Sequence, residues 1–86
     1  MAEVDKLLKS LANSRRLAIL KYLQRTDRAS VSDIARHIKL SFKATSKHLA
    51  ILSNVDIVEK QQEGLVMWHR LNKQKHPIVA EVLKHT

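Results

Sequence analysis

The chain has 86 residues, 44% of them hydrophobic, which favours one domain over the whole of 1–86. Sixteen Lys and Arg residues against eight Asp and Glu give a formal net charge of +8. This balance favours a polyanion as the partner, although a basic domain kept soluble by its charge would have the same composition. The absence of cysteine excludes disulfides, thiolate zinc sites and thiol redox sensing within this chain.

No apolar run approaches the roughly 20 residues of a membrane span. Asp5, Lys6 and Lys9 interrupt the opening helical pattern, so we expect no signal peptide there. The sequence therefore predicts an intracellular, cytoplasmic protein with no membrane partner.

Apolar residues at helical spacing predict two helices in the first third of the chain. The first covers about 2–12, and its apolar stripe is Val4, Leu7, Leu8 and Leu11. The second begins after Asn13 or Ser14, either of which can cap it. Its buried face carries Leu17, Leu20 and Leu23, widened by Ile19. The polar run 24–29 breaks this periodicity, and we expect it to be a loop.

The segment at about 30–54 predicts two short helices joined by a tight connection. Ser30 can cap the first, with Asp33 as a weak capping box, and Ser41 can cap the second. The second helix turns Thr45, Leu49 and Leu52 inward. Its outward face carries Phe42, Lys43, Ser46, Lys47 and Ala50. A small, hydroxyl-rich, basic face suits the DNA major groove, so this pattern favours a helix-turn-helix whose second helix enters that groove.

A hairpin and a last helix follow. Strands are predicted at about 57–62 and 65–71, and Gly64 between them can supply the positive φ of a tight turn. The last helix should run from about Lys73 or Pro77 to the end, because Pro fits the first helical turn. The predicted fold is therefore mainly α, a winged helix-turn-helix with four helices, a two-stranded wing at about 57–71 and a C-terminal helix.

The sequence resembles the ArsR/SmtB family of bacterial and archaeal winged-helix repressors over nearly its whole length. LKSLANSRRLAIL at 8–20 is similar to the family's LKALADPTRLRIL at the start of the second helix. Residues 40–41, 46–49 and 52, which read LS, SKHL and L, are similar to its LSxxxxSxHLxxL recognition helix. Residues 57–58, 63–64 and 70–71 are similar to its wing. The resemblance implies a homodimer that binds a palindromic operator and releases it when an effector binds.

The chain departs from the resemblance where metal-sensing members hold their metal. Their third helix often begins Cys-Val-Cys-Asp, whereas this chain has Ser-Val-Ser-Asp at 30–33. Serine hydroxyls are poor ligands for soft metals. The family's other site, on the last helix, is not matched, since His76 and His85 would lie on opposite helix faces. We predict no metal and no cofactor, and the sequence does not identify an effector.

The helix from 41 to 54 supplies most of the candidate DNA contacts. Its lysines could be an ordinary solvated face, but beside several hydroxyl groups they favour DNA. We expect Lys43, Ser46 and Lys47 to lie nearest the bases. Ser41 and Thr45 should lie nearer the phosphates. The predicted DNA contacts on this helix are Ser41, Phe42, Lys43, Thr45, Ser46, Lys47 and His48.

Several further candidates carry open alternatives. His48 could reach a phosphate or could be partly buried. Arg15 and Arg16 could hold phosphates, stand in solvent or pair with an acidic side chain, and their position at a helix start is unfavourable for the helix dipole. Lys60 and Arg70 are candidate minor-groove or backbone contacts from the wing.

The apolar stripe of the first helix could cover the core, but with an apolar last helix nearby it favours a dimer interface. We predict a symmetric homodimer joined through helices at about 2–12 and 74–86. The predicted interface residues are Val4, Leu7, Leu8, Leu11, Val79, Val82 and Leu83.

No nucleophile–base pairing, phosphate-binding Gly-rich loop or carboxylate cluster is evident, so we predict that the chain is not an enzyme. The sequence predicts a transcriptional regulator that binds duplex DNA sequence-specifically, as a homodimeric repressor without the cysteine metal site. The alternative is a winged helix that binds another protein, RNA or non-B DNA.

Overall fold

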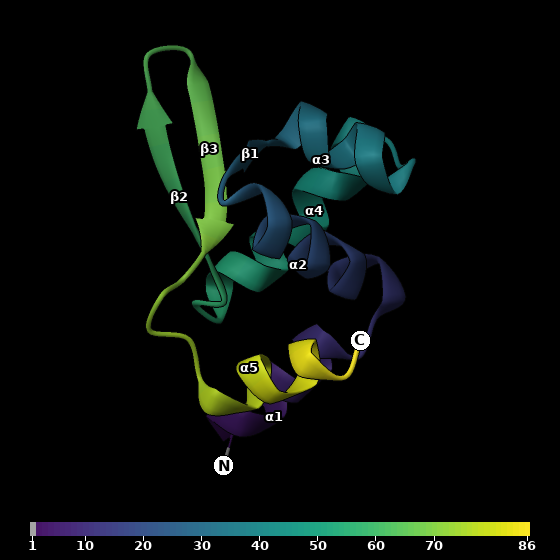
Figure 1. The fold of residues 1–86 in the computed structure, drawn as a ribbon, viewed down its shortest axis with the longest axis vertical. Helices are drawn as coiled ribbons and strands as arrows, with labels where there is room; N and C mark the ends of the chain where they lie inside the picture. Colours follow the sequence, from purple (N-terminus) through teal and green to yellow (C-terminus); the bar gives the residue numbers. More distant parts are fainter. Residues whose placement is uncertain (1) are drawn as a thin grey trace.

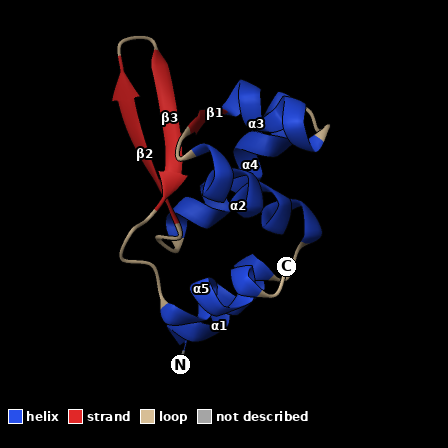
Figure 2. Ribbon diagram, in the orientation of Figure 1, coloured by secondary structure: helices blue, strands red, loops and turns tan. Residues whose placement is uncertain are grey.

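The computed structural model describes residues 2–86 and shows helices packed beside a small antiparallel sheet (Figures 1 and 2). The elements in chain order are α1 (Ala2–Leu11), α2 (Ser14–Thr26), β1 (Ala29–Ser30), α3 (Val31–Ile38), α4 (Phe42–Asn54), β2 (Val58–Glu63), β3 (Val66–Leu71) and α5 (Pro77–Lys84). The β2–β3 hairpin projects from the helices at one end, and α1 and α5 lie at the opposite end (Figure 1). Within 2–86, no helix combines the length and the apolar character that crossing a membrane requires.

Capping side chains fix where three of the helices begin. Asn13, Ser30 and Ser41 each accept a hydrogen bond from the backbone N–H three residues later, at 3.0, 3.2 and 3.1 Å. Helix α3 ends at Lys39, whose backbone is left-handed with φ of 58°. Helix α4 begins three residues after Lys39, so α3 and α4 form the tight helix-turn-helix that the sequence predicted.

The sheet has one strand more than the sequence predicted, in the order β1-β3-β2. Gly64 turns the β2–β3 hairpin with φ of 60°. Ala29 and Ser30 form β1 and pair with His69 and Trp68 of β3. The prediction of a loop over 24–29 is therefore wrong: α2 continues to Thr26, and Ala29 joins the sheet. A strand of two residues has no alternation to detect, and it forms because β3 offers it an unpaired edge.

The core is one cluster to which every helix contributes. Its side chains with almost no exposure include Ile19, Leu20 and Leu23 of α2, Ile34 of α3, Leu52 of α4 and Val79 of α5. Ile57 and Val58 cover the base of the hairpin in the same cluster. The core therefore fixes one face of α4 against the rest of the chain.

The structure corrects the predicted dimer interface. Some of its residues are buried within the single chain, each 6% exposed or less, namely Leu7, Leu11, Val79 and Leu83. Because α1 and α5 already cover these side chains, they have almost no surface left for a partner, and the prediction is wrong for them. Leu8 is 46% exposed, while Val4 and Val82 are partly buried, so the apolar surface that remains at this end is smaller than predicted.

Candidate nucleic-acid interface

Helix α4 has one buried face and one open face. Leu49 and Leu52 hold it in the core. On the open face Phe42 is 60% exposed, Lys43 and Lys47 are exposed, and Ser46 is half-buried beside them. The helix contains no acidic residue. The structure therefore brings together, on one exposed helix face, the residues that the sequence placed nearest the bases.

Thr45 corrects the predicted site. Its side chain is 0% exposed, and its Oγ1 atom has no hydrogen-bond partner within residues 2–86. A side chain in the core cannot reach a phosphate, so its assignment as a DNA contact is wrong. The helical spacing that joins Thr45 to Leu49 and Leu52 indicates an inward position, and a hydroxyl group on that face does not change it.

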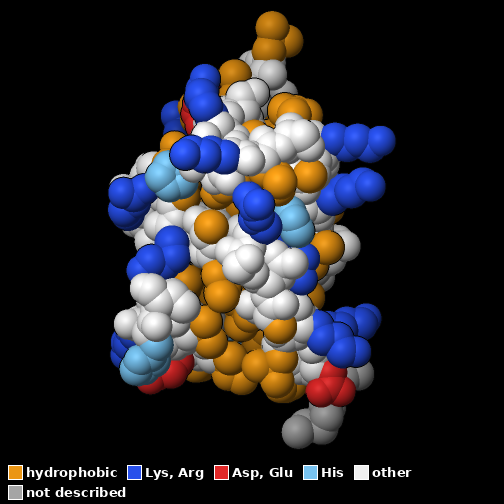
Figure 3. Space-filling model, turned by 90° about the vertical axis from the view of Figure 1, so that its right-hand side faces the viewer, with side chains coloured by type: hydrophobic (Ala, Val, Ile, Leu, Met, Phe, Trp, Pro, Cys, Tyr) orange, Lys and Arg blue, Asp and Glu red, His pale blue; other side chains and the backbone are white. Residues whose placement is uncertain are grey.

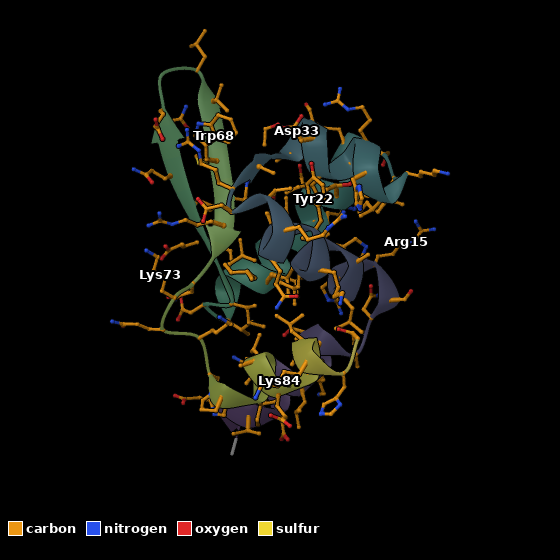
Figure 4. The ribbon with its side chains drawn as sticks, viewed as in Figure 1. Arg15, Tyr22, Asp33, Trp68, Lys73 and Lys84 are labelled. Carbon is orange, nitrogen blue, oxygen red and sulfur yellow. The ribbon has the colours of Figure 1, made fainter. Side chains whose placement is uncertain are left out.

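Arg15 holds the turn of the helix-turn-helix. Its Nη1 atom donates to the backbone oxygen of Ile38, the last residue of α3, at 3.1 Å. The end of a helix leaves carbonyl oxygens without helical partners, and a guanidinium satisfies one of them here. Arg15 remains exposed at the start of α2 (Figure 4), so its contact with a phosphate stays a prediction.

Arg16 joins three elements. Its Nε atom donates to the backbone oxygen of Ser10 at 2.6 Å, and its Nη2 atom donates to that of Lys9 at 3.2 Å. Its Nη1 atom lies 3.2 Å from Nδ1 of His48 on α4. The half-buried Arg16 therefore connects the end of α1 to α4, an arrangement that was not among its predicted alternatives. No local pattern could have indicated it, because Arg16 and His48 lie 32 residues apart.

His48 is partly buried, which is one of the two readings that the sequence left open, and its contact with a phosphate stays a prediction. Its ring is half-buried, and it lies at the edge of the exposed face of α4 rather than at its centre. Burial, and then the charges of Arg16 and Arg15, hold the pKa of His48 below its ordinary value of 6.5. The neutral ring is therefore favoured near neutral pH.

Arg28 anchors the wing and was missed by the sequence reasoning. Its guanidinium lies over the ring of Trp68, 4.3 Å from the centroid, and forms an ion pair with Glu63 at the end of β2. Figure 4 shows Trp68 on the hairpin. Arg28 comes directly before β1, in the segment that the sequence predicted as a loop. Arg28 reaches Trp68 because the strand that follows it, β1, pairs with β3.

The predicted cations of the wing have different surroundings. Arg70 donates from Nε to Glu59 at 2.7 Å across the β2–β3 pair, whereas Lys60 is exposed. The wing tip is apolar, with Leu65 fully exposed. A groove between this tip and the start of α4 is lined by residues of β1, α3, α4 and β3, Phe42 among them. The start of α4 and the wing therefore border one continuous surface, and the DNA contacts of Lys60 and Arg70 stay predictions.

Ser30, one of the two serines where the family resemblance implies cysteine in metal-sensing members, caps α3 here. Ser30 accepts the N–H of Asp33, and the Asp33 carboxylate binds Arg36 at 2.6 Å. Among residues 2–86, no three His, Asp or Glu side chains come together as a possible metal site. The absence of a metal in the working protein stays a prediction.

Comparison with known proteins identifies the family. Residues 13–60 match the family model described as bacterial regulatory protein, arsR family. This chain belongs to the ArsR family. It is 34% identical over 77 residues to the transcriptional activator HlyU of Vibrio cholerae, covering 90% of this chain and 70% of HlyU. It is 29% identical over 72 residues to a cadmium resistance regulatory protein, a CadC homolog of Staphylococcus aureus, covering 84% of this chain and 60% of that protein.

Solved structures agree with the ArsR-family assignment. Reduced HlyU from Vibrio cholerae superposes with a TM-score of 0.80 at 33% identity, covering 98% of this chain and 87% of that one. The homodimeric winged helix-turn-helix DNA-binding domain Mb0332 from Mycobacterium bovis gives 0.83 at 28% identity, with 98% and 74% covered. The ArsR-family chain is thus a transcriptional regulator with a winged helix-turn-helix DNA-binding domain, and it is not an enzyme.

Proposed function

We propose that this ArsR-family chain is a homodimeric repressor that binds a palindromic site in duplex DNA with α4 in the major groove. The observation that carries the proposal is the exposed face of α4. Lys43, Ser46 and Lys47 lie together on it, with Phe42 at its start and no acidic side chain on the helix. Lysine can donate to guanine or to phosphate, and an apolar ring can contact a thymine methyl group.

The charge of the whole chain supports a duplex partner. The net charge is +8, and two of the cations stand four residues apart on the open face of α4. Neutralising phosphates releases condensed counterions, so affinity should fall steeply with salt, by about 0.9 log units per log unit of salt for each phosphate contacted. Half-sites should lie about one helical turn apart, roughly 10 base pairs, if two copies bind one face of the duplex.

The dimer is supported by the apolar surface that remains at the end formed by α1 and α5. Figure 3 shows hydrophobic side chains gathered over the lower part of this face, with Lys and Arg side chains along its edges. Leu8 is the large apolar residue exposed there, with Val4 and Val82 partly buried. The homodimeric Mb0332 domain, of the same fold, supports pairing through a second copy. Sedimentation that gives only monomer at tens of micromolar, a range typical of weak dimers, would contradict it.

Metal sensing through α3 is not part of the proposal. Ser30 and Ser32 lack the polarisable, easily deprotonated sulfur that thiophilic metals select. The CadC homolog is named for cadmium resistance, and this chain has no cysteine with which to bind that metal. We expect titration of the folded protein with zinc, cadmium and arsenite to show no binding through these two serines. Any binding that is observed should therefore remain in the double variant Ser30→Ala with Ser32→Ala. Binding that this double variant abolishes, together with release of DNA, would overturn the prediction.

The deciding experiment selects bound sequences from random duplex DNA and then measures affinity at several salt concentrations. The variant Lys43→Ala with Lys47→Ala should bind about tenfold more weakly or worse, with a shallower salt slope, because charge-assisted hydrogen bonds are lost. The matched control is Lys73→Ala with Lys84→Ala, which removes the same charge from the loop before α5 and from α5 itself. Equal affinity for the two double variants would contradict the docking of α4.

The apolar wing tip favours one other function, a winged helix that binds a protein partner. Leu65 is fully exposed, and Val66 and Met67 beside it are partly so. A protein-binding module would show no duplex affinity at moderate salt.

Transcription from a template that carries the selected site would distinguish a repressor from an activator, and HlyU is named as an activator. A regulator of this kind would act in the cytoplasm, where bacterial DNA lies.

A further inference from the structure

The contact between Arg16 and His48 determines where the proton of the imidazole lies. A guanidinium has five N–H donors and no acceptor, so the nitrogen that it faces must carry a free lone pair. The 3.2 Å contact is between Nη1 of Arg16 and Nδ1 of His48. In the neutral ring, one nitrogen carries hydrogen and the other accepts. With Nδ1 accepting, the hydrogen of His48 is on Nε2.

The guanidinium is held firmly enough to impose this tautomer. Two of its other nitrogens donate to the backbone oxygens of Ser10 and Lys9, at 2.6 and 3.2 Å. These oxygens belong to the last turn of α1, where helical partners are lacking and the helix dipole is negative. A planar fork fixed at two points has little freedom at the third. The Arg16 donor therefore has one direction, toward α4.

The opposite nitrogen of the ring is available to a ligand. Nε2 of His48 has no hydrogen-bond partner among the described residues, and it is not among their buried polar atoms without a partner. His48 stands about 100° around α4 from Lys47, on the flank of the exposed face that adjoins the start of α2. A donor on the flank of a helix in the major groove faces the sugar–phosphate backbone rather than the base edges.

We infer that Arg16 is a positioning residue that holds His48 as the neutral Nε2–H tautomer, so that α4 presents one uncharged donor to a phosphate oxygen of the DNA backbone. This inference rests on the proposed function for its ligand, but the tautomer itself does not depend on DNA. Burial, and then the charge of Arg16, lower the pKa of His48, which agrees with a neutral ring beside the guanidinium.

The first test reads the tautomer in the free protein. Nitrogen-15 spectra of the histidine rings at pH 7.5 should show hydrogen on Nε2 of His48 and a lone pair on Nδ1. Arg16→Met removes the donor and should give a mixture of both tautomers. Hydrogen on Nδ1 in the wild type, or a spectrum that Arg16→Met leaves unchanged, would overturn the inference. If Arg16→Met does not fold, the wild-type spectrum alone still decides the tautomer.

The second test reads the donor in the complex, with Arg16 intact and the selected duplex as the probe. His48→Gln places an N–H group near the position of Nε2, whereas His48→Asn offers Arg16 an acceptor but has no group that reaches so far. His48→Gln should bind within about threefold of the wild type. His48→Asn should bind about tenfold more weakly per half-site, the loss of one hydrogen bond to a charged acceptor. The salt slope of both variants should match the wild type, because the lost donor is uncharged.

The outcomes separate this inference from the proposed function. Replacing single phosphates of the duplex by methylphosphonates should identify one phosphate per half-site at which the wild type loses affinity and His48→Asn does not. Absence of duplex binding by the wild type would overturn the proposed function. Wild-type binding that His48→Asn leaves unchanged, or a loss that maps to a base and to no phosphate, would overturn the role of His48 alone.

Discussion

The two elements proposed to meet DNA, α4 and the wing, are held in place in different ways. Helix α4 is fixed by a buried face that includes Leu52, which is 0% exposed, and by the contact of Arg16 of α2 with His48. Arg15 of α2 holds the end of α3, directly before the turn that leads into α4.

The wing is held at the middle of β3 by β1, which pairs with His69 and Trp68, and by Arg28, which lies over Trp68 and forms an ion pair with Glu63 near the turn. Leu65 in the turn is fully exposed. The helix is therefore held by core packing, whereas the outer part of the wing is held by partly exposed contacts.

The largest expected effect tests this difference directly. Leu52→Ala empties a buried site, so the free energy of unfolding should fall by about 3 kcal/mol. Leu65→Ala makes the same chemical change at the exposed tip, and the free energy of unfolding should stay within about 0.5 kcal/mol of the wild type. Urea unfolding followed by circular dichroism measures both. Similar losses in the two variants would mean that the tip is packed as firmly as α4.

A smaller effect with the opposite sign is expected at Thr45. Its buried hydroxyl has no partner within residues 2–86, and an unsatisfied buried polar group is costly. Thr45→Val keeps the shape and removes that group, so the free energy of unfolding should rise by about 1 kcal/mol. DNA affinity should be unchanged, since the side chain faces the core. If Thr45→Val keeps the stability of the wild type but binds DNA more weakly, the prediction of a phosphate contact by Thr45 would stand again.

Loss of Arg28 should affect the wing and leave α4 unchanged. Its contacts with Trp68 and Glu63 are partly exposed, so Arg28→Ala should lower the free energy of unfolding by only about 0.5–1 kcal/mol. Amide exchange should accelerate in β2 and β3 and stay slow in α4. Faster exchange in both elements would show that they open together.

The last expected effect is absent at neutral pH and appears only on acidification. Burial, and then the charge of Lys60, lower the pKa of His69 from its ordinary 6.5. Below about pH 6.5 the unfolded chain gains a proton that the folded chain refuses, so stability should fall as pH falls toward the folded pKa. His69→Phe should flatten this dependence between pH 7 and 5, with His85→Gln as an exposed control. An unchanged slope in His69→Phe would assign the acid sensitivity to other groups.

The elements could be predicted from the sequence because their signals are local. Asn13, Ser30 and Ser41 cap helices within three residues of themselves, and Gly64 marks its turn by its own backbone. The exposed face of α4 followed from helical spacing alone. The same spacing indicated the buried position of Thr45, and chemical reasoning about hydroxyl groups overrode it.

The parts that could not be predicted depend on distant partners. An apolar stripe shows that Leu7 and Leu11 are covered, but not that α5 of the same chain shares their cluster. Arg16 and His48 lie 32 residues apart, and Arg28 and Glu63 lie 35 apart, so neither pair leaves a periodic signal. The two-residue strand β1 exists only because β3 is beside it.

Ser30 is shared by two structures. As the second residue of β1 it pairs with Trp68, and its hydroxyl accepts the backbone N–H of Asp33 in the first turn of α3. There is no linker between the sheet and that helix in which rotation could be absorbed. A ligand that tilts α3 would therefore move the middle of β3 with it, because Ser30 pairs with Trp68 and leads directly into α3. The sheet and α3 would then change their angle together. The distance between the wing and α3, which both line the groove beside Phe42, is therefore limited by the direct chain connection at Ser30.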